Sequence, residues 1–143
     1  MPVIITELDD GLGNLIKGEG LVAGEEFYKA LSEHVAKPEA QLKQYIYSIS
    51  DYTEITDNDV SIPYLYKAAL IMDDIASVNK NILIGIAASD PVAYNLAKLF
   101  SSAARVTGWK FGVFRKRADL DCWLIENLGE KHGKLNLKFD KKL

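Results

Sequence analysis

Carboxylates and hydroxyls concentrate between Asp51 and Ser61, directly after a stretch rich in aromatic and β-branched residues. The predicted contact residues of this segment are Asp51, Tyr52, Thr53, Asp57, Asn58, Asp59 and Ser61. Their oxygens would suit a hard cation, but the segment lacks the glycine and the glutamate that an EF-hand loop requires at its sixth and twelfth positions. A solvated, helix-capping loop or a contact surface for another protein is the better interpretation, because loops on a rigid scaffold commonly carry binding. We therefore predict no metal site.

Three glycines, Gly18, Gly20 and Gly24, lie between a predicted strand and a predicted helix. Glycines in such a place could let backbone amides approach the pyrophosphate of a dinucleotide. However, acidic side chains at residues 19, 25 and 26 already occupy the positive end of the helix, and a hairpin precedes it. A flexible turn is the favoured interpretation, and we predict no cofactor.

The usual catalytic groups are sparse. His34 and His132 are far apart in the sequence, and they compose neither a Ser-His-Asp order nor a metal-binding pair. Cys122 has no base near it in sequence and adjoins Trp123, which is predicted to face the core, so we predict a structural thiol. The basic cluster of residues 115–117 is predicted to be solvated, with a small anion or partner contact as the alternative. We predict no catalytic residue and no enzymatic activity.

Hydrophobic periodicity predicts the elements that must position these groups. Strands are predicted over residues 3–8, 12–17, 45–50, 82–88 and 109–114. Helices are predicted over residues 24–37, 62–78, from Pro91 to a stop at Gly108, and over 115–128. The order β-β-α-β-α-β-α-β-α predicts an α/β fold with a single mixed, mostly parallel sheet, in which the N-terminal hairpin supplies the antiparallel strand. Residues 1–129 would form this domain.

Residues 130–143 form a lysine-rich tail in which Leu135, Leu137 and Phe139 alternate with polar residues. An alternation of this kind is typical of a strand, so we predict that the tail could add to a sheet edge of the same or a neighbouring chain.

The helix over residues 62–78 carries more apolar surface than one sheet contact requires, which is an arc of roughly 100°. Two adjacent apolar stripes contain Leu65, Ala69, Met72 and Ala76, and Tyr64, Ala68, Ile71, Ile75 and Val78. Tyr66 and Leu70 lie toward the polar side. We predict that Tyr64, Tyr66 and Leu70 form a partner or ligand face and that the protein is a two-fold homodimer.

The composition narrows the classes of partner. The net charge is −3, so no overall positive field attracts nucleic acid, and the single cysteine excludes an internal disulfide. No apolar run approaches the roughly 20 residues of a transmembrane helix. The first residues lack the pattern of a signal peptide. We expect a cytoplasmic protein.

Short motifs along most of the chain carry a family resemblance. They are I-x-E-L-D-x-G-L-G at residues 5–13, S-D-Y-T at residues 50–53, G-W followed by V-F-R within residues 108–115, and W-L at residues 123–124. Together with the hairpin-first order of elements, they resemble the SpoIIAA-like proteins of bacteria, which are related to the STAS domains of anti-sigma-factor antagonists. The resemblance extends to Leu128 and implies a STAS-type fold that binds another protein.

In anti-sigma-factor antagonists, the loop after the third strand carries Asp-Ser-Ser/Thr-Gly, and phosphorylation of the serine releases the partner. Residues 57–60 occupy the matching place and read Asp-Asn-Asp-Val, so the resemblance implies no serine switch at Asn58 or Asp59. Thr56 and Ser61 are the hydroxyl residues nearby, and a phosphate at Ser61 would meet a helix N-terminus. SpoIIAA-like proteins are also grouped by fold with lipid-binding CRAL-TRIO domains, which keeps an amphiphilic ligand open.

We therefore expect a non-enzymatic binding domain. It would contact an unidentified protein partner through residues 51–61 and through the exposed side of the helix over residues 62–78. The alternative is a carrier of a small amphiphile or lipid, held between that helix and the one that begins at Pro91.

Overall fold

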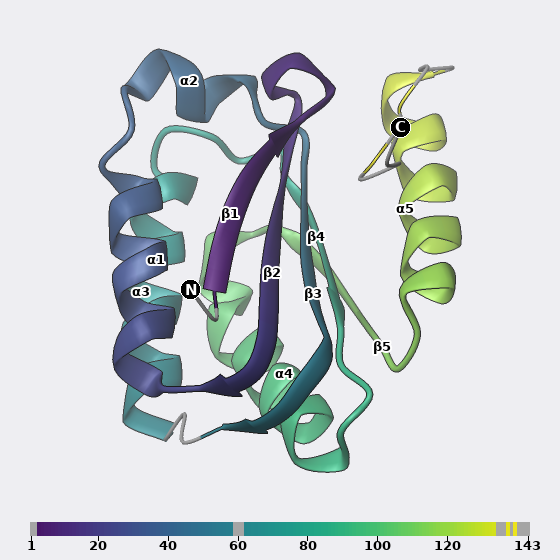
Figure 1. The fold of residues 1–143 in the computed structure, drawn as a ribbon. Helices are drawn as coiled ribbons and strands as arrows, with labels where there is room; N and C mark the ends of the chain where they lie inside the picture. Colours follow the sequence, from purple (N-terminus) through teal and green to yellow (C-terminus); the bar gives the residue numbers. More distant parts are fainter. Residues whose placement is uncertain (1–2, 59–61, 134–136, 138, 140–143) are drawn as a thin grey trace.

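The computed structural model describes residues 3–58, 62–133, 137 and 139, and it contains one five-stranded sheet in the order β1-β2-β3-β4-β5 (Figure 1). The strands are β1 (Val3–Leu8), β2 (Gly13–Val22), β3 (Tyr47–Asn58), β4 (Leu83–Ala87) and β5 (Lys110–Phe114). β1 pairs with β2 in the antiparallel sense, and every later pair is parallel. The predicted α/β fold class, with a mixed sheet and an N-terminal hairpin, is confirmed.

Helices connect the strands and cover both faces of the sheet (Figure 1). They are α1 (Gly24–Val35), α2 (Glu39–Gln44), α3 (Ile62–Ala76), α4 (Pro91–Ala103) and α5 (Arg117–His132), with the short 3-10 turns η1 (Asp9–Gly11) and η2 (Ala104–Thr107). The crossovers between neighbouring parallel strands share one hand, so α1, α3 and α4 lie on the same face. α5 follows the last strand and covers the opposite face.

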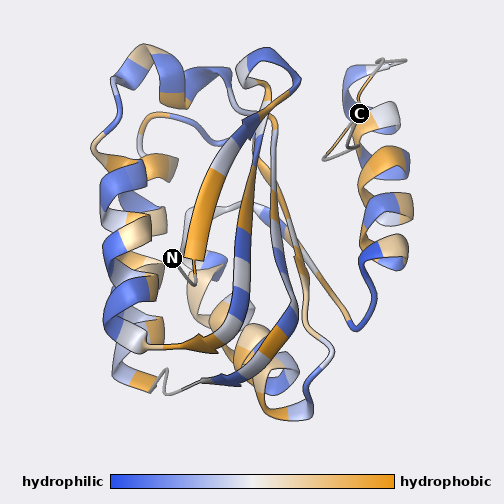
Figure 2. Cartoon of the chain, viewed as in Figure 1, coloured by the Kyte–Doolittle hydropathy of each residue, from blue (hydrophilic) through white to orange (hydrophobic). Residues whose placement is uncertain are grey.

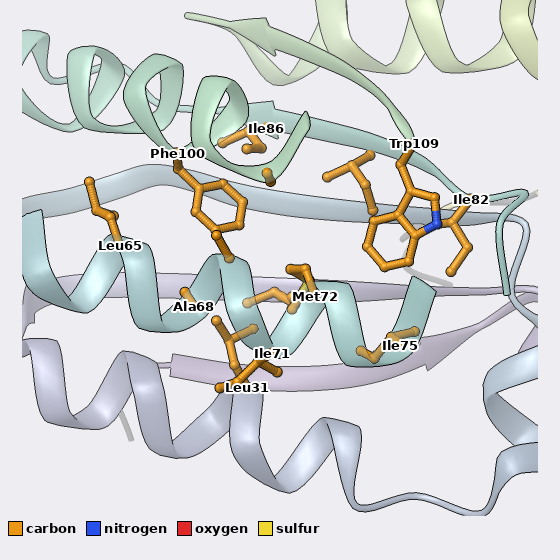
Figure 3. Close-up of a cluster of buried hydrophobic side chains, with 14 of the residues drawn as sticks. Leu31, Leu65, Ala68, Ile71, Met72, Ile75, Ile82, Ile86, Phe100 and Trp109 are labelled. Carbon is orange, nitrogen blue, oxygen red and sulfur yellow. The ribbon is translucent and has the colours of Figure 1, made fainter. Parts of the chain in front are cut away.

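Two hydrophobic cores result, one on each face of the sheet. The larger core lies beneath α1, α3 and α4 and includes Leu31, Met72 and Phe100 (Figure 3). The smaller core packs Leu120 and Leu124 of α5 against β3 and β4. The helices accordingly turn apolar residues toward the sheet, and their outer sides carry many polar residues (Figure 2) together with a few exposed apolar ones.

The position of α3 explains its two apolar stripes. α3 packs against the sheet and also lies between α1 and α4, which it contacts on either side. Seven of its residues are buried, namely Leu65, Ala68, Ala69, Ile71, Met72, Ile75 and Ala76. Neighbouring helices of the same chain therefore cover most of the apolar surface that one sheet contact cannot cover.

The prediction of a loop directly after the third strand is largely wrong. Residues 51–58 continue β3, and residues 18–22, predicted as a flexible turn, continue β2. β3 is paired with β2 on one side and with β4 on the other as far as Asp51. Beyond Asp51, β3 is paired with β2 alone, and that pairing contains two register shifts. Gly20 lies at the second shift with φ +63°, a conformation in which glycine avoids the strain of a side chain. We call residues 19–22 and 52–58 the β2–β3 ribbon.

Two further segments differ from the prediction. A short helix, α2, forms where only a polar connection was expected, and its buried residue is Leu42. In the tail, the two described residues with apolar side chains, Leu137 and Phe139, are not in a strand; they pack on the smaller core. Leu135 lies outside the described residues.

Candidate functional site

Asp51 lies at the carboxyl end of the segment of β3 that is paired on both sides, and its side chain is buried. Arg117 of α5 reaches it with Nη1 3.1 Å from Oδ2, while the backbone N–H and the hydroxyl of Thr53 donate hydrogen bonds to Oδ1 at 3.0 and 2.7 Å. Arg117 also binds Asp121 through Nε at 2.8 Å. Burial alone would raise the pKa of Asp51, but these hydrogen bonds and the Arg117 charge outweigh it and lower that pKa. Asp51 therefore joins α5 to the sheet and is not available to a partner.

The other predicted contact residues of this segment occupy different environments. Tyr52 is half-buried, and its ring packs edge-on against Phe27 with ring centroids 6.1 Å apart. Thr53 is half-buried beside Asp51, whereas the side chain of Asp57 is exposed on the β2–β3 ribbon. The backbone of Asn58 pairs with Val22, and Asp59 and Ser61 lie outside the described residues.

The outward side of α3 carries three apolar residues spaced four apart. Ile62, Tyr66 and Leu70 are 50%, 54% and 66% exposed, and we call them the α3 outer stripe. The exposed carboxylates of Asp73 and Asp74 follow it on the same helix. Because Tyr66 and Leu70 are accessible, they remain candidates for a partner face.

Tyr64, the third residue predicted for that face, packs between α1 and α3. Its ring lies 6.5 Å from that of Tyr28, and Lys67 Nζ lies 5.4 Å from its centroid. A Cβ at Gly24 would come within 2.6 Å of the same ring, so the glycine permits this close approach. Tyr64 thus contributes to the helix pair rather than to an open surface.

An apolar cavity of about 80 Å³ lies between the sheet and helices α1, α3 and α4. It is lined by Ile16, Val22, Phe27, Leu31, Ser48, Ser50, Tyr52, Ile55, Leu65, Met72, Ile84, Ile86, Ala93, Leu96, Ala97 and Phe100. Figure 3 shows Phe100 of α4 and Met72 of α3 projecting into the interior between these helices and the sheet. The hydroxyls come from one side of β3, at Ser48, Ser50 and Tyr52. Burial raises the pKa of the Tyr52 phenol above its ordinary value, so that this group stays neutral at physiological pH.

A buried polar cluster lies near the first residues of β3, next to the cavity, and shares Ser48 with its lining. Asn14 Nδ2 donates a hydrogen bond to His34 Nε2 at 3.2 Å, and Ser48 Oγ donates to Asn14 Oδ1 at 2.6 Å. Within the described part of the chain, Nδ1 of His34 is buried without a hydrogen-bond partner. Burial, reinforced by the charge of Lys37, lowers the pKa of His34 to about 4. The spacing of residues in the sequence gives no sign that Asn14 is the partner of His34.

This cluster is bordered by a second group of hydrogen bonds near the surface. Tyr45 donates through its hydroxyl to Glu7 Oε2 at 2.6 Å, and Lys37 Nζ and Gln41 Nε2 bind the same carboxylate at 3.3 and 2.8 Å. These bonds tie α2 and the connections on either side of it to β1. They hold this end of the helical layer over the sheet.

The groups considered for catalysis or metal binding remain separate. Among residues whose positions are described, no cluster of three or more histidine, cysteine, aspartate or glutamate side chains could hold a metal ion. Cys122 is exposed, so its prediction as a structural thiol is wrong. It lies two residues from both Leu120 and Leu124, and that spacing turns it away from the face of α5 that they bury.

The basic cluster of residues 115–117 divides between two environments. Arg115 lies over the ring of Tyr94, with Cζ 4.4 Å from the centroid, whereas Arg117 is committed to Asp51 and Asp121. The cluster therefore presents no single array of cations to an anion.

Comparisons with protein-family models, with curated proteins and with solved structures found no match. Within the described residues, no helix combines the length and the apolar character needed to cross a membrane. The surfaces and cavities of the chain itself are therefore the basis for inferring its function.

Proposed function

We propose that this protein is a non-enzymatic binding domain of SpoIIAA-like, STAS-type fold that contacts another protein through the α3 outer stripe and the exposed end of the β2–β3 ribbon. The hairpin-first mixed sheet is consistent with that fold. The observation that carries the proposal is the stripe itself, because Ile62, Tyr66 and Leu70 remain exposed although seven other residues of α3 are buried. Exposed apolar residues gathered on one surface are characteristic of interaction sites.

The simplest occupant of this stripe is a second copy of the chain. Two-fold symmetry lets the same surface cover itself, so one patch serves both protomers. In an antiparallel arrangement of two α3 helices about an axis near Tyr66, Leu70 of one protomer would meet Ile62 of its partner. The exposed carboxylates Asp73 and Asp74 would then lie at the rim of the interface, where charges remain hydrated.

Sedimentation velocity of the full chain tests this proposal. We expect a dimer at concentrations of tens of micromolar, and we expect the double variant Tyr66→Ser, Leu70→Ser to sediment as a monomer with unchanged helix content. Ile125→Ser is the matched control, because Ile125 is similarly exposed but lies on α5, on the opposite side of the sheet. A monomeric wild type would contradict the self-association, and a double variant that still dimerises would exclude the α3 outer stripe as its interface.

A different protein partner predicts a different result. The wild type would then be a monomer, and photo-crosslinking groups at position 66 would capture a partner that the same group at position 125 does not capture. If position 66 crosslinks neither a second copy nor another protein, the α3 outer stripe is not an interaction site.

A further inference from the structure

The cavity beneath α3 and α4 lies on the inner side of these helices and is independent of the α3 outer stripe. Its volume of about 80 Å³ is several times the roughly 10–15 Å³ that one water molecule requires. Its walls are mostly aliphatic and aromatic side chains, among them Leu65, Ala97 and Phe100. Such a space left empty deprives its lining atoms of contacts, which makes it costly to keep unless something occupies it.

We propose that this cavity binds one small, uncharged, largely apolar molecule whose single polar group is directed to the hydroxyls of Ser50 and Tyr52. The ligand class would be a compact alcohol, phenol or ketone. This inference goes beyond the proposed protein contact and does not depend on it.

The charge of the ligand follows from the lining. No residue lining the cavity in the described part of the chain is charged. A buried carboxylate or ammonium group would therefore lose its hydration without gaining a counter-ion, and this loss is prohibitive in an apolar site. Anionic molecules such as fatty acids would have to leave their charged end outside.

The polar group of the ligand has a defined place to bind. Ser50 is buried, Tyr52 is half-buried, and both side chains line the cavity. Each hydroxyl supplies one donor and two acceptor positions, so the pair retains an O–H that a ligand oxygen can accept. Ser48 is less available, because its hydroxyl already donates to Asn14.

The size of the ligand follows from the volume and from Met72. Apolar cavities of roughly 150 Å³ bind benzene, so a space of about 80 Å³ admits a molecule smaller than benzene and admits a single ring only when the cavity enlarges. The unbranched thioether of Met72 lines the cavity and can change rotamer to enlarge it. A single ring with one hydroxyl is therefore a suitable probe.

Methyl NMR of the full chain with labelled methionine tests the proposal with phenol as the probe. The sequence contains two methionines, and Met72 lines the cavity whereas Met1 lies outside the described residues. We expect phenol to shift the Met72 methyl signal saturably in the millimolar range and to leave the Met1 signal in place. Benzoate, which has the same ring but carries a charge, should shift neither signal.

Variants of the lining residues test whether phenol binds inside the cavity. Ala97→Leu fills the space and should abolish the saturable shift, while Ala118→Leu on the exposed surface of α5 should retain it. Tyr52→Phe removes a hydroxyl. It should weaken the binding of phenol at least several-fold and leave the binding of toluene unchanged. If Ala97→Leu does not fold, Ala93→Val serves as a smaller filling change.

Three results would contradict the binding of a small apolar ligand in the cavity. A Met72 signal that does not saturate, an equal response to benzoate, or an unchanged response in the filled variant would each overturn the proposal. None of these results would bear on dimerisation, because the α3 outer stripe remains intact in every variant used.

Discussion

Asp51 and Asp57 lie on the same strand and carry the same charge, yet they are expected to differ in their contribution to stability. Asp51 is buried against Arg117 and Thr53, whereas Asp57 is exposed. Removing one member of a buried ion pair leaves the other without compensation. Asp51→Asn should lower the free energy of unfolding by about 2 kcal/mol or more, and Asp57→Asn should change it by less than ~0.5 kcal/mol.

Urea unfolding at neutral pH measures both variants under the same conditions. A comparable small effect for both would mean that the Arg117–Asp51 pair contributes little in solution. A large loss for Asp57→Asn would mean that this carboxylate supports the β2–β3 ribbon and is not simply part of an exposed surface.

His34 should make stability depend on pH. Its pKa is lowered from 6.5 to about 4 by burial first and by Lys37 second, so the unfolded chain binds a proton more readily than the folded chain between these values. The stability associated with neutral His34 is therefore complete above pH 6.5 and is lost as the pH falls toward 4. The slope can reach about 1.4 kcal/mol per pH unit.

Comparison with His34→Gln isolates this contribution, because acidic side chains also titrate at low pH. The variant should show a shallower loss of unfolding free energy below pH 6.5 than the wild type. His132→Gln, at an exposed position on α5, should retain most of the wild-type slope. Equal slopes in all three proteins would show that His34 is protonated without penalty in the folded state.

At the scale of the elements, periodicity was sufficient for the five strands and four longer helices but not for their lengths. The carboxylates and hydroxyls of residues 51–58 predict a loop. Yet Tyr52, Thr53, Ile55 and Thr56 all favour extended backbone, and Tyr52 and Ile55 turn inward to line the cavity. A polar composition alone therefore did not distinguish an exposed loop from a strand that is solvated on one side.

The candidate site was predictable only in part, for a related reason. The exposed positions of Tyr66 and Leu70 follow from helical spacing, which is a local property. The burial of Asp51 depends on Arg117, 66 positions further along the chain, and the enclosure of Tyr64 depends on α1. Pairings of this kind are set by tertiary packing and leave no periodic signal in the sequence.

The side chain of Phe139, in the C-terminal tail, helps to close the smaller core. Phe139 is buried in the smaller core, with its ring centroid 5.2 Å from that of Tyr47. Phe139→Ala should reduce the free energy of unfolding by about 3 kcal/mol, since a large buried side chain is lost. Ile125→Ala, at an exposed position on α5, should have little effect. An unchanged denaturation midpoint for Phe139→Ala would show that the smaller core is closed without the tail.

For the molecule as a whole, the two faces of the sheet are covered unequally. Three helices pack on one face and border the cavity, whereas α5 and the side chains of Leu137 and Phe139 pack on the other. A ligand within the first layer and a partner on the outside of α3 would therefore act on the same helix from opposite sides. Their effects can be separated experimentally, because the two sets of side chains do not overlap.

The strictly sequential strand order has a consequence for how the chain acquires its structure during synthesis. Each strand pairs with the strand that precedes it in the chain, but only the β1–β2 hairpin is local, because each parallel pair joins strands that are separated by a connecting helix, as in Ser48 with Ile84. Parallel pairing across such connections forms more slowly than local contacts do. As the polypeptide leaves the ribosome, each new strand would meet an edge that is already formed. The hydrogen bond from the backbone N–H of Phe139 to the Asp9 carboxylate, which joins positions 130 residues apart, must form after nearly all of this chain has emerged.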